Sequence, residues 1–412
     1  MTQPVSSQSA AGLTSANPPR SVFAVLLPIT LAVFIGFLAL GVVLPVLPLH
    51  IHGELGMSTL VVGTVAGAQF AAALLSRAWA GGIADIRGAK VSVVSGQLAS
   101  TLAGVCYLLS THYAAEPTVA VGILLLGRVL QGSGESLIVT GALSWGVGLV
   151  GPQNAGKVMA WVGIAIYGAY AAGAPVGVHF LGSNGFVGVA TVSALLPLIG
   201  WAVIATVKPI APSAVKRVPF YRVLSSVWLP GLGLALSSVG FGLLTAFVSL
   251  LFAGHAWGSA SLMFTAFGVS FIAARLLFGH LPDKVGGAKV ALVCVLIEAA
   301  GQLLIWLSSS PQVAYVGAAL TGFGYSLAFP GFGVEAVKRA PPQNRGAAMG
   351  AYVAFLDIAL GVASPGAGAI ANAWGVDAVY LAGTVAVAMA VLVATRLLLA
   401  GPTPTSAPVQ AA

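Results

Sequence analysis

From Val22 onward the sequence is a succession of long apolar stretches separated by short polar segments. Each stretch is close to the roughly 20 residues that a helix needs to cross the hydrocarbon layer of a bilayer. A backbone in lipid must satisfy its own hydrogen bonds, and the stretches lack the alternation of barrel strands, so we predict that each is a helix. The twelve predicted spans are residues 22–49, 57–80, 91–111, 117–145, 156–180, 185–207, 224–253, 259–281, 288–308, 312–337, 345–370 and 374–399.

Composition excludes a soluble globular protein. Only 6% of the 412 residues are charged, against about a quarter in soluble domains, and 58% are hydrophobic. Both cysteines, Cys106 and Cys294, lie inside apolar stretches, so the sequence predicts neither a disulfide framework nor a metal site. The sequence also contains no Walker-type phosphate loop, which argues against ATP as an energy source.

Basic residues fall almost entirely on one side of the predicted spans. Those on the side of the N-terminus are Arg20, Arg87, Lys90, Lys157, Lys208, Lys216, Arg217, Arg222, Lys284, Lys289, Lys338, Arg339, Arg345 and Arg396, and the opposite loops carry no Lys or Arg. The positive-inside rule therefore places both termini in the cytoplasm. The formal net charge of +8 is thus a topology signal, and we predict no nucleic-acid partner.

Polar segments divide the chain into two halves. Residues 1–20 are rich in Ser, Ala, Gln and Pro without an apolar core, which predicts a disordered cytoplasmic tail rather than a cleavable signal peptide. The predicted cytoplasmic linker, residues 208–223, carries four basic residues and three prolines. It separates an N-terminal six-helix bundle, residues 21–207, from a C-terminal one, residues 224–400, and residues 401–412 form a second cytoplasmic tail.

The two halves repeat each other. Arg77, Gly81 and Asp85 recur 198 positions later as Arg275, Gly279 and Asp283, and Gly132 and Gly134 recur 190 positions later as Gly322 and Gly324. Homologous halves with an even number of spans have the same orientation in the membrane. The predicted fold class is therefore an all-α integral membrane protein with twelve transmembrane helices in two pseudo-symmetric six-helix bundles.

Three motifs carry a family resemblance. The segment after the second span reads GGIADIRGAK at residues 81–90, its copy after the eighth reads GHLPDKVGGAK at residues 279–289, and the fourth span contains RVLQGSGE at residues 128–135. With these motifs the chain resembles the major facilitator superfamily of secondary transporters, and within it a bacterial branch of arabinose-efflux-like and drug-efflux permeases. Ile86 departs from the usual basic residue, and Ala174 replaces the Gly that precedes proline in the antiporter motif.

The resemblance implies a mechanism as well as a fold. Members alternate access by rocking two halves around a central site, and they usually work as monomers. We accordingly expect a multi-pass protein of the bacterial cytoplasmic (inner) membrane that binds a small-molecule substrate and protons within the lipid bilayer. The expected energy source is the proton gradient, with no cofactor.

Charges inside the membrane are costly, so each is a candidate for function. Arg128, Gln131 and Glu135 share one face of the fourth span. Arg128 and Glu135 are separated by about 10 Å along the axis, which leaves bridging by Gln131 or pairing across the cavity as alternatives. We predict that Glu135 carries a proton while Arg128 stabilises its ionised form or holds an anionic substrate group. The alternative is a structural polar network.

Asp357, in the eleventh span, is the second predicted proton carrier. No Lys or Arg lies near it in the same span, so burial is expected to favour its protonated form. The alternative is a structural, hydrogen-bonded Asp. Glu298, in the ninth span, either serves transport or turns inward to a hydrogen-bonding neighbour.

A cytoplasmic gate is predicted where the repeated motif ends its helices. An Asp there can accept hydrogen bonds from a neighbouring helix N-terminus in only one of two domain orientations. The predicted gate residues are Arg77, Gly81, Asp85, Arg87, Lys90, Arg275, Gly279, Asp283 and Lys284. The alternative is a tight-turn and topology signal without a mechanical role.

The predicted substrate cavity consists of aromatic and polar side chains on spans that face the cavity in the resembled family. They are Gln69, Gln131, Trp145, Tyr167, Tyr170, Phe241, Phe247, Tyr325, Phe329 and Tyr352. Each of them taken singly also fits a packing role.

The leading hypothesis is a proton-coupled secondary transporter, a proton antiporter that exports a small organic or amphipathic compound. The alternative is a proton symporter or uniporter that takes up a sugar-like or anionic nutrient, with Arg128 on the substrate. An intramembrane enzyme is a distant alternative, because the six histidines all fall at or near ends of spans. We therefore predict that the protein is not an enzyme.

Overall fold

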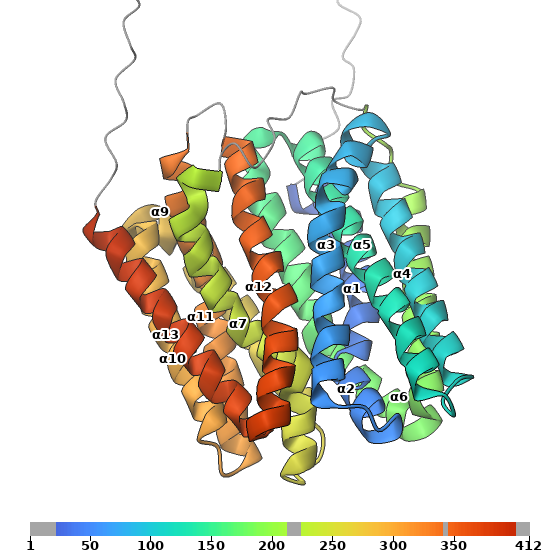
Figure 1. Ribbon diagram of the computed structural model, residues 1–412. Helices are drawn as coiled ribbons and strands as arrows, with labels where there is room; N and C mark the ends of the chain where they lie inside the picture. The colour runs from blue at the N-terminus through green and yellow to red at the C-terminus, as the bar shows by residue number, and fades with distance from the viewer. Residues whose placement is uncertain (1–21, 212–223, 341–344, 401–412) are drawn as a thin grey trace, which may run out of the picture.

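The structure is a computed structural model that describes residues 22–211, 224–340 and 345–400. Within these ranges every regular element is a helix, and the long helices lie side by side in one bundle (Figure 1). The elements are α1 (Val22–Val43), α2 (Leu47–Leu49), η1 (His50–Glu54), α3 (Thr59–Ile86), α4 (Ala89–Thr111), α5 (Pro117–Val150), η2 (Pro152–Asn154), α6 (Ala155–Ala205), α7 (Leu224–Gly254), α8 (Ser261–Phe278), α9 (Leu281–Val285), α10 (Gly287–Trp306), α11 (Pro311–Arg339), α12 (Arg345–Trp374) and α13 (Val376–Leu399).

The predicted number of membrane crossings agrees with these helices. Eleven helical segments in the described ranges are long and apolar enough to span a bilayer, the first being the continuous run Val22–Glu54. The longest, α6, has 51 residues and contains Gly185 in a non-helical conformation with φ of 63°, so it consists of two spans joined by a kink. The all-α membrane fold is therefore confirmed, with α6 supplying the fifth and sixth crossings.

Several helices extend beyond the apolar windows from which they were predicted. The second predicted span ends at residue 80, whereas α3 continues to Ile86 and includes Gly81 and Asp85. Hydropathy detects only the part of a helix in hydrocarbon, and the interfacial turns continue in polar surroundings. The first half of the GGIADIRGAK motif is accordingly helical.

A glycine within each copy of that motif directly precedes the next helix. Gly88 precedes α4 with φ of 99°, and Gly286 precedes α10 with φ of 109°. Only glycine adopts such positive φ values without steric cost. The recurrence of this glycine 198 positions later is therefore explained by the same sharp turn in both halves.

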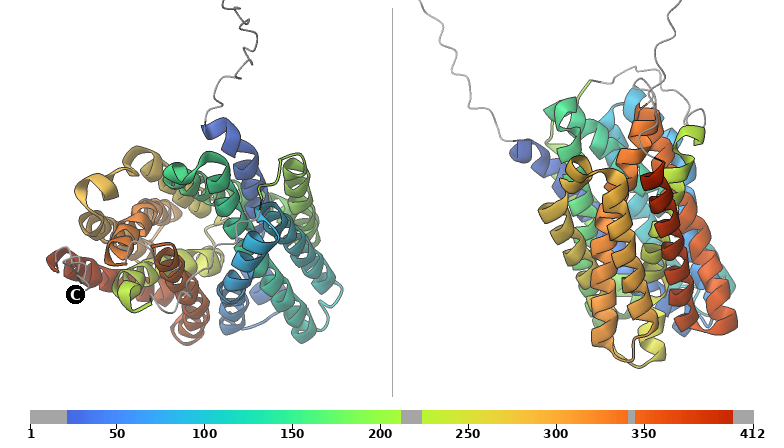
Figure 2. Two further views of the ribbon diagram at one scale, coloured as in Figure 1. Left: turned by 90° about the horizontal axis from the view of Figure 1, so that it is seen from above. Right: turned by 90° about the vertical axis from the view of Figure 1, so that its left-hand side faces the viewer.

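The two halves pack internally by the same contacts. A Cβ atom at Gly132 would lie 2.0 Å from the carbonyl oxygen of Gln69, and one at Gly322 would lie 2.2 Å from that of Phe267. These two close contacts are equivalent under the sequence offsets of 190 and 198 residues. Figure 2 shows the resulting arrangement along the bundle axis, with the blue-to-green half beside the yellow-to-red half.

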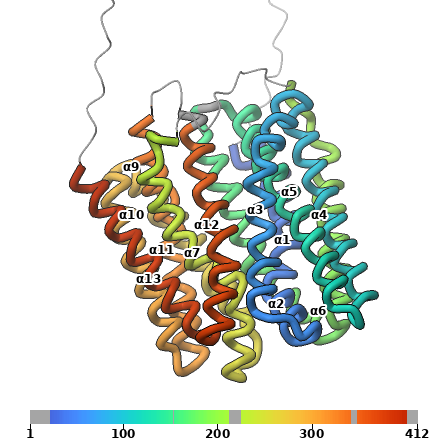
Figure 3. Tube along the Cα trace, viewed as in Figure 1, coloured from blue at the N-terminus to red at the C-terminus, as the bar shows by residue number. Residues whose placement is uncertain are grey.

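The halves meet along two pairs of helices, α3 with α12 and α6 with α8. The Cα trace shows α3 and α12 running side by side in the middle of the molecule (Figure 3). We call the end of the bundle where α1 begins and α13 ends the terminal side. The other end is called the opposite side.

Contacts between α3 and α12 are tightest on the opposite side. A Cβ at Gly63 would lie 2.2 Å from the carbonyl oxygen of Ser364, and the hydroxyl of Thr59 donates to the carbonyl of Gly368 at 3.1 Å. Toward the terminal side, a Cβ at Gly361 would meet α3 only at 3.5 Å. The two helices therefore diverge toward the terminal side, as Figure 1 also shows.

The predicted domain boundaries fall partly outside the described residues. Both predicted tails, residues 1–20 and 401–412, and residues 212–223 of the predicted linker lie outside the described residues. Among described residues, α6 ends at Ala205 and α7 begins at Leu224.

Candidate functional site

Helix α3 organises the polar groups between the two halves. Gln69 and Arg77 are eight residues apart in α3, which places them on one face of the helix about two turns apart. Each of these side chains contacts a carboxylate from a different helix, Glu135 in α5 and Asp357 in α12. Helix α3 is therefore in contact with both predicted proton carriers.

Glu135 is held inside the N-terminal half. The amide nitrogen Nε2 of Gln69 donates to Oε2 of Glu135 at 2.8 Å. The side chains can meet because Gly132, one turn earlier in α5, lets the backbones of α3 and α5 approach closely. The predicted contribution of Gln131 differs, since its amide Nε2 lies 3.4 Å from the Ser100 hydroxyl and does not bridge Arg128 to Glu135.

Asp357 forms an ion pair across the two halves. The guanidinium nitrogens Nε and Nη2 of Arg77 both donate to Oδ2 of Asp357, the first at 2.9 Å. The Asp357 side chain is 4% exposed and that of Arg77 27% exposed. The sequence prediction considered only cations in the same span as Asp357, and the structure supplies one from α3, 280 positions away.

Arg77 was predicted at a cytoplasmic gate, with an Asp at the end of its own helix. In the structure it lies two turns deeper than Asp85 and pairs with Asp357. Glu135 is within electrostatic range of Asp357, Arg77 and Arg128. The two carboxylates and two arginines thus form one electrostatically connected group, which we call the α3 network: Arg77, Arg128, Glu135 and Asp357.

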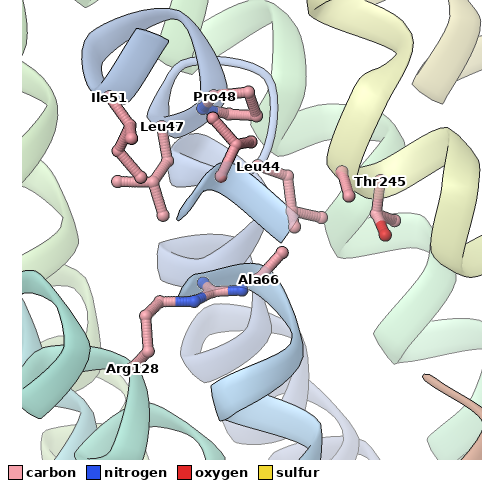
Figure 4. A pocket seen from close by; sticks show the side chains of 9 residues that line it. Leu44, Leu47, Pro48, Ile51, Ala66, Arg128 and Thr245 are labelled. Carbon is pink, nitrogen blue, oxygen red and sulfur yellow. The ribbon is translucent and has the colours of Figure 1, made fainter. Parts of the chain in front are cut away.

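Arg128 is buried without a carboxylate partner. Its side chain is 2% exposed, and its Nε and Nη1 atoms have no hydrogen-bond partner among the described residues. The guanidinium faces a small cavity of about 10 Å³, near the volume that holds one water molecule. Figure 4 shows it directed toward Ala66, with other lining residues from the turn after α1 and from α2, η1, α3 and α7.

That cavity lies where the two halves close on the opposite side. Its lining includes Leu44 and Leu47 from the N-terminal half and Thr245 from the C-terminal half. Thr245 was absent from the predicted cavity, although it follows Phe241 by one helical turn. The spacing of four residues from Phe241, which places both side chains on one face of the span, is the signal that would have found it.

Four predicted cavity residues meet in one aromatic cluster between the halves. The ring of Tyr167 lies 5.6 Å from that of Phe241 and 6.1 Å from that of Tyr325, and Tyr170 is 5.9 Å from Phe241. Phe241 and Tyr325 stack at 5.6 Å with an interplanar angle of 7°. The predicted set therefore converges from α6, α7 and α11.

Two members of this aromatic cluster were missed. Phe271 in α8 lies 3.8 Å from Tyr167, and Phe267 lies 5.4 Å from Phe241. Phe267 stands 198 positions after Gln69, which was in the predicted set. The internal repeat was therefore a signal that would have identified it.

Other predicted cavity residues have partners within one half. The Trp145 indole donates to the carbonyl of Lys208 at 3.3 Å, which ties α5 to the end of α6. The Tyr352 hydroxyl donates to the carbonyl of Phe329 at 2.6 Å, so α12 is joined to α11. Phe247 is fully buried in α7. For these four residues, packing accounts for the contacts seen.

Arg275 lies in α8, beside the aromatic cluster. Its Cζ atom is 5.3 Å from the centroid of Phe271, and its Nε is buried without a hydrogen-bond partner in the described ranges. The hydroxyl groups of Tyr167, Tyr325 and Tyr352 lie within electrostatic range of the guanidinium. Arg275 is thus a second arginine whose guanidinium forms no ion pair with a described carboxylate.

The remaining predicted gate residues lie at helix ends on the terminal side. Lys90 donates from Nζ to the carbonyls of Ala205 and Val207 at 2.7 and 2.8 Å, so it caps the C-terminus of α6 within the N-terminal half. Gly81, Asp85 and Arg87 lie at the end of α3, whereas Gly279, Asp283 and Lys284 lie around α9. Arg87, Asp283 and Lys284 are exposed.

Glu298 lies inside the C-terminal half. It is fully buried in α10, and the Ser237 hydroxyl of α7 donates to its Oε2 at 2.6 Å. A Cβ at Gly324 would lie 2.8 Å from Glu298 Cβ, so α11 encloses it on another side. This geometry matches the expectation of an inward-turned, hydrogen-bonded Glu298.

Comparison with known proteins gives consistent results. The sequence model of the Major Facilitator Superfamily matches residues 29–259 and 231–412. An uncharacterized MFS-type transporter of Burkholderia mallei (strain SAVP1) is 43% identical over 395 residues, covering 94% of this chain and 96% of that protein. An uncharacterized MFS-type transporter of Salmonella typhimurium is 42% identical over 353 residues, covering 86% of this chain and 91% of that protein.

Solved structures show the same fold. The crystal structure of a D-xylose-proton symporter superimposes with a TM-score of 0.73 and 16% sequence identity, covering 90% of this chain and 97% of that one. At this identity the likeness concerns the fold alone.

Proposed function

The chain belongs to the major facilitator superfamily, and the related proteins compared above are transporters and not enzymes. On this basis we propose that the chain is a proton-coupled antiporter. In this proposal it exports a small organic or amphipathic compound from the cytoplasm by rocking its two halves. The cargo passes through the space between α3, α6, α8 and α12. Glu135 and Asp357 carry the protons.

The observation that carries the proposal is the position of these two carboxylates. Glu135 and Asp357 are held on one face of α3, and Asp357 comes from the other half. A carboxylate that forms an ion pair with an arginine of the other half stabilises only those conformations in which the two halves are close at that point. Protonation of Asp357 would remove the attraction to Arg77, so proton binding and rocking share one contact.

The direction of opening supports the sidedness of the proposal. Helices α3 and α12 touch backbone to backbone at Gly63 on the opposite side and diverge toward the terminal side. The exposed basic residues Arg87, Lys284 and Arg396 lie on the terminal side, which the positive-inside rule assigns to the cytoplasm. In this proposal the terminal side faces the cytoplasm of a bacterial inner membrane, and the conformation opens to it.

The proposed antiport cycle uses these contacts. In the inward-opening state the ionised Asp357 pairs with Arg77 and holds α12 against α3 until cargo binds. After rocking, protons from outside neutralise Asp357 and Glu135, and the cargo leaves. The protonated transporter returns, and release of the protons to the cytoplasm forms the ion pair again.

The test uses purified protein in proteoliposomes with a pH-sensitive dye inside. A compound panel is first screened by thermal shift, and hits are then added outside the vesicles. Antiport predicts that entry of a hit drives protons out and makes the lumen alkaline. Uptake by proton symport predicts an acidified lumen, and a uniporter predicts no proton movement.

Two neutral substitutions test the assigned carriers. Glu135→Gln and Asp357→Asn should each lower proton-coupled flux at least about a hundredfold, the lower end of what a positioned proton-transfer group contributes. Glu116→Gln, at an exposed carboxylate before α5, is the matched control and should retain flux. Full pH-dependent flux in both carrier variants would refute the assignment.

A further inference from the structure

Arg275 is the residue equivalent to Arg77 in the internal repeat. Arg275 stands 198 positions after Arg77, at the equivalent place in α8. The residue equivalent to Asp357 is Tyr167, which stands 190 positions before it, in the first span of α6. The α6–α8 interface therefore has the same arginine as the α3–α12 interface, with a tyrosine where the other has an aspartate.

The missing carboxylate leaves Arg275 uncompensated. Its Nε is buried without a hydrogen-bond partner, and no ion pair to it occurs among the described residues. The titratable groups near its guanidinium are the hydroxyls of Tyr167, Tyr325 and Tyr352, which are uncharged at neutral pH. Glu298 is enclosed within the C-terminal half by Ser237 and α11 and does not pair with it.

The charges of the α3 network taken together with Arg275 do not balance either. The arginines there are Arg77, Arg128 and Arg275, whereas the described carboxylates are Glu135 and Asp357. Only Arg77 has an ion-pair partner. Arg128 is buried and Arg275 is partly buried, and an unpaired cation shielded from water is costly, so a bound anion would reduce that cost.

The surroundings of Arg275 are aromatic. Phe271 lies against its guanidinium, and the rings of Tyr167, Phe241 and Tyr325 belong to the same aromatic cluster. Such rings pack against an apolar, ring-containing body, and tyrosine hydroxyls donate to an anionic oxygen. Guanidinium binds carboxylate, sulfonate and phosphate groups in a two-pronged geometry.

From these observations we propose that the cargo is an organic anion with a ring-containing body, and that Arg275 binds its anionic group. This inference rests on the proposed function, because it takes the space between the halves as the route of the cargo. Arg275, predicted at a gate, is thereby a substrate-binding residue. Tyr167 and Tyr325 are its assisting donors.

The experiment measures equilibrium binding to the purified full-length protein in detergent, without a proton gradient. The probes are 1-naphthoate, naphthalene-1-sulfonate and 1-naphthyl phosphate, each beside an uncharged counterpart: the amide, the sulfonamide and the alcohol. At least one anion should bind about 10- to 100-fold more tightly than its uncharged counterpart, as for a hydrogen bond to a charged group. Equal or weaker binding of all three anions would overturn the proposal.

Variants separate Arg275 from the general positive charge. Arg275→Gln should abolish the preference for the anion, whereas Arg396→Gln, at an exposed arginine near the end of α13, should retain it. Persistence of the preference in Arg275→Gln would refute the role of this residue.

A second variant answers the objection that Arg275→Gln merely misfolds. Tyr167→Asp gives Arg275 a carboxylate, as Asp357 does for Arg77, and should keep the thermal stability while excluding the anion. A Tyr167→Asp protein that binds the anion as tightly as the parent would contradict the proposal. Binding is measured without a proton gradient, so the two proposals can fail separately. Anion binding without proton-coupled flux would refute only the antiport proposal. Proton-coupled flux of an uncharged cargo, with no preference for anions, would refute only the anion-binding proposal.

Discussion

The two interfaces between the halves are formed by helices that are equivalent under the internal repeat, but their side chains differ in chemistry. At α3–α12, Arg77 is neutralised by Asp357. At α6–α8, the equivalent Arg275 faces Tyr167 and the ring of Phe271. Gene duplication thus supplied one scaffold twice, and the divergence of a single partner residue turned one arginine into a contact between the halves and left the other free for a ligand.

The largest expected effect comes from breaking the ion pair. Arg77→Gln leaves the buried carboxylate of Asp357 without a cation, and loss of one partner of a buried pair costs about 3 kcal/mol. Arg275→Gln removes no ion pair and should leave stability unchanged or higher. The measurement is the unfolding free energy of each variant in matched micelles.

Asp357→Asn sharpens the same comparison. The Arg77 side chain is 27% exposed and can reach water when it has no partner. Asp357→Asn should therefore lower the unfolding free energy less than Arg77→Gln does. The charge-swapped double variant Arg77→Asp with Asp357→Arg should recover part of the stability. Equal stability of Arg77→Gln and Arg275→Gln would contradict the distinction between the interfaces.

A medium effect is expected at the backbone contact of α3 with α12. Gly63→Val places a side chain 2.2 Å from the carbonyl oxygen of Ser364, so the helices must separate on the opposite side. If the clash destabilises the conformation closed on the opposite side by about 1 kcal/mol, the population open on that side rises about fivefold. The readout is the maleimide reactivity of a cysteine placed at Ala66, beside the Arg128 cavity.

The counterpart at α6–α8 offers a parallel test. A Cβ at Gly268 would lie 2.6 Å from Cβ of Ala171, so Gly268→Val should raise the same reactivity. Gly182→Val, where a Cβ meets nothing within 4 Å, is the control. Unchanged labelling in both interface variants would count against closure by these contacts.

The smallest effect concerns the basic residues of the two motif copies. Lys90 ends the first motif copy and caps α6 through two carbonyls, whereas Lys289, which ends the longer second copy one position past the 198-residue offset, is exposed. Lys90→Gln should cost about 1 kcal/mol of stability and Lys289→Gln less than about 0.5 kcal/mol. Matching thermal shifts for the two variants would show that the cap does not stabilise the first half.

The fold was predictable because its signals extend along the whole chain. Apolar runs, one-sided Lys and Arg, and the repeat of Arg77 as Arg275 are each readable without knowledge of packing. The kink at Gly185 was also located, since the fifth and sixth spans were separated there. The ends of α3 were less predictable, because helices extend past the hydrocarbon that hydropathy detects.

The site was predictable residue by residue but not as a set of contacts. Asp357 was selected as a costly buried charge, yet its partner Arg77 comes from a helix 280 positions away. Arg77 itself was assigned to a gate from a motif that continues through Asp85. Which side chains meet depends on helix register and on glycines such as Gly132, and neither property can be read from a single helix.

The central claim, that the halves rock about the α3–α12 contact held by Arg77 and Asp357, is tested most directly by distances between spin labels in nanodiscs. One pair sits on the terminal side at Ile86 and Gly350, and the other on the opposite side at Leu60 and Trp374, all exposed positions. On introduction of Asp357→Asn, the account predicts a shorter terminal-side distance and a longer opposite-side distance. Distances that stay fixed, or that change in the same direction, would contradict it.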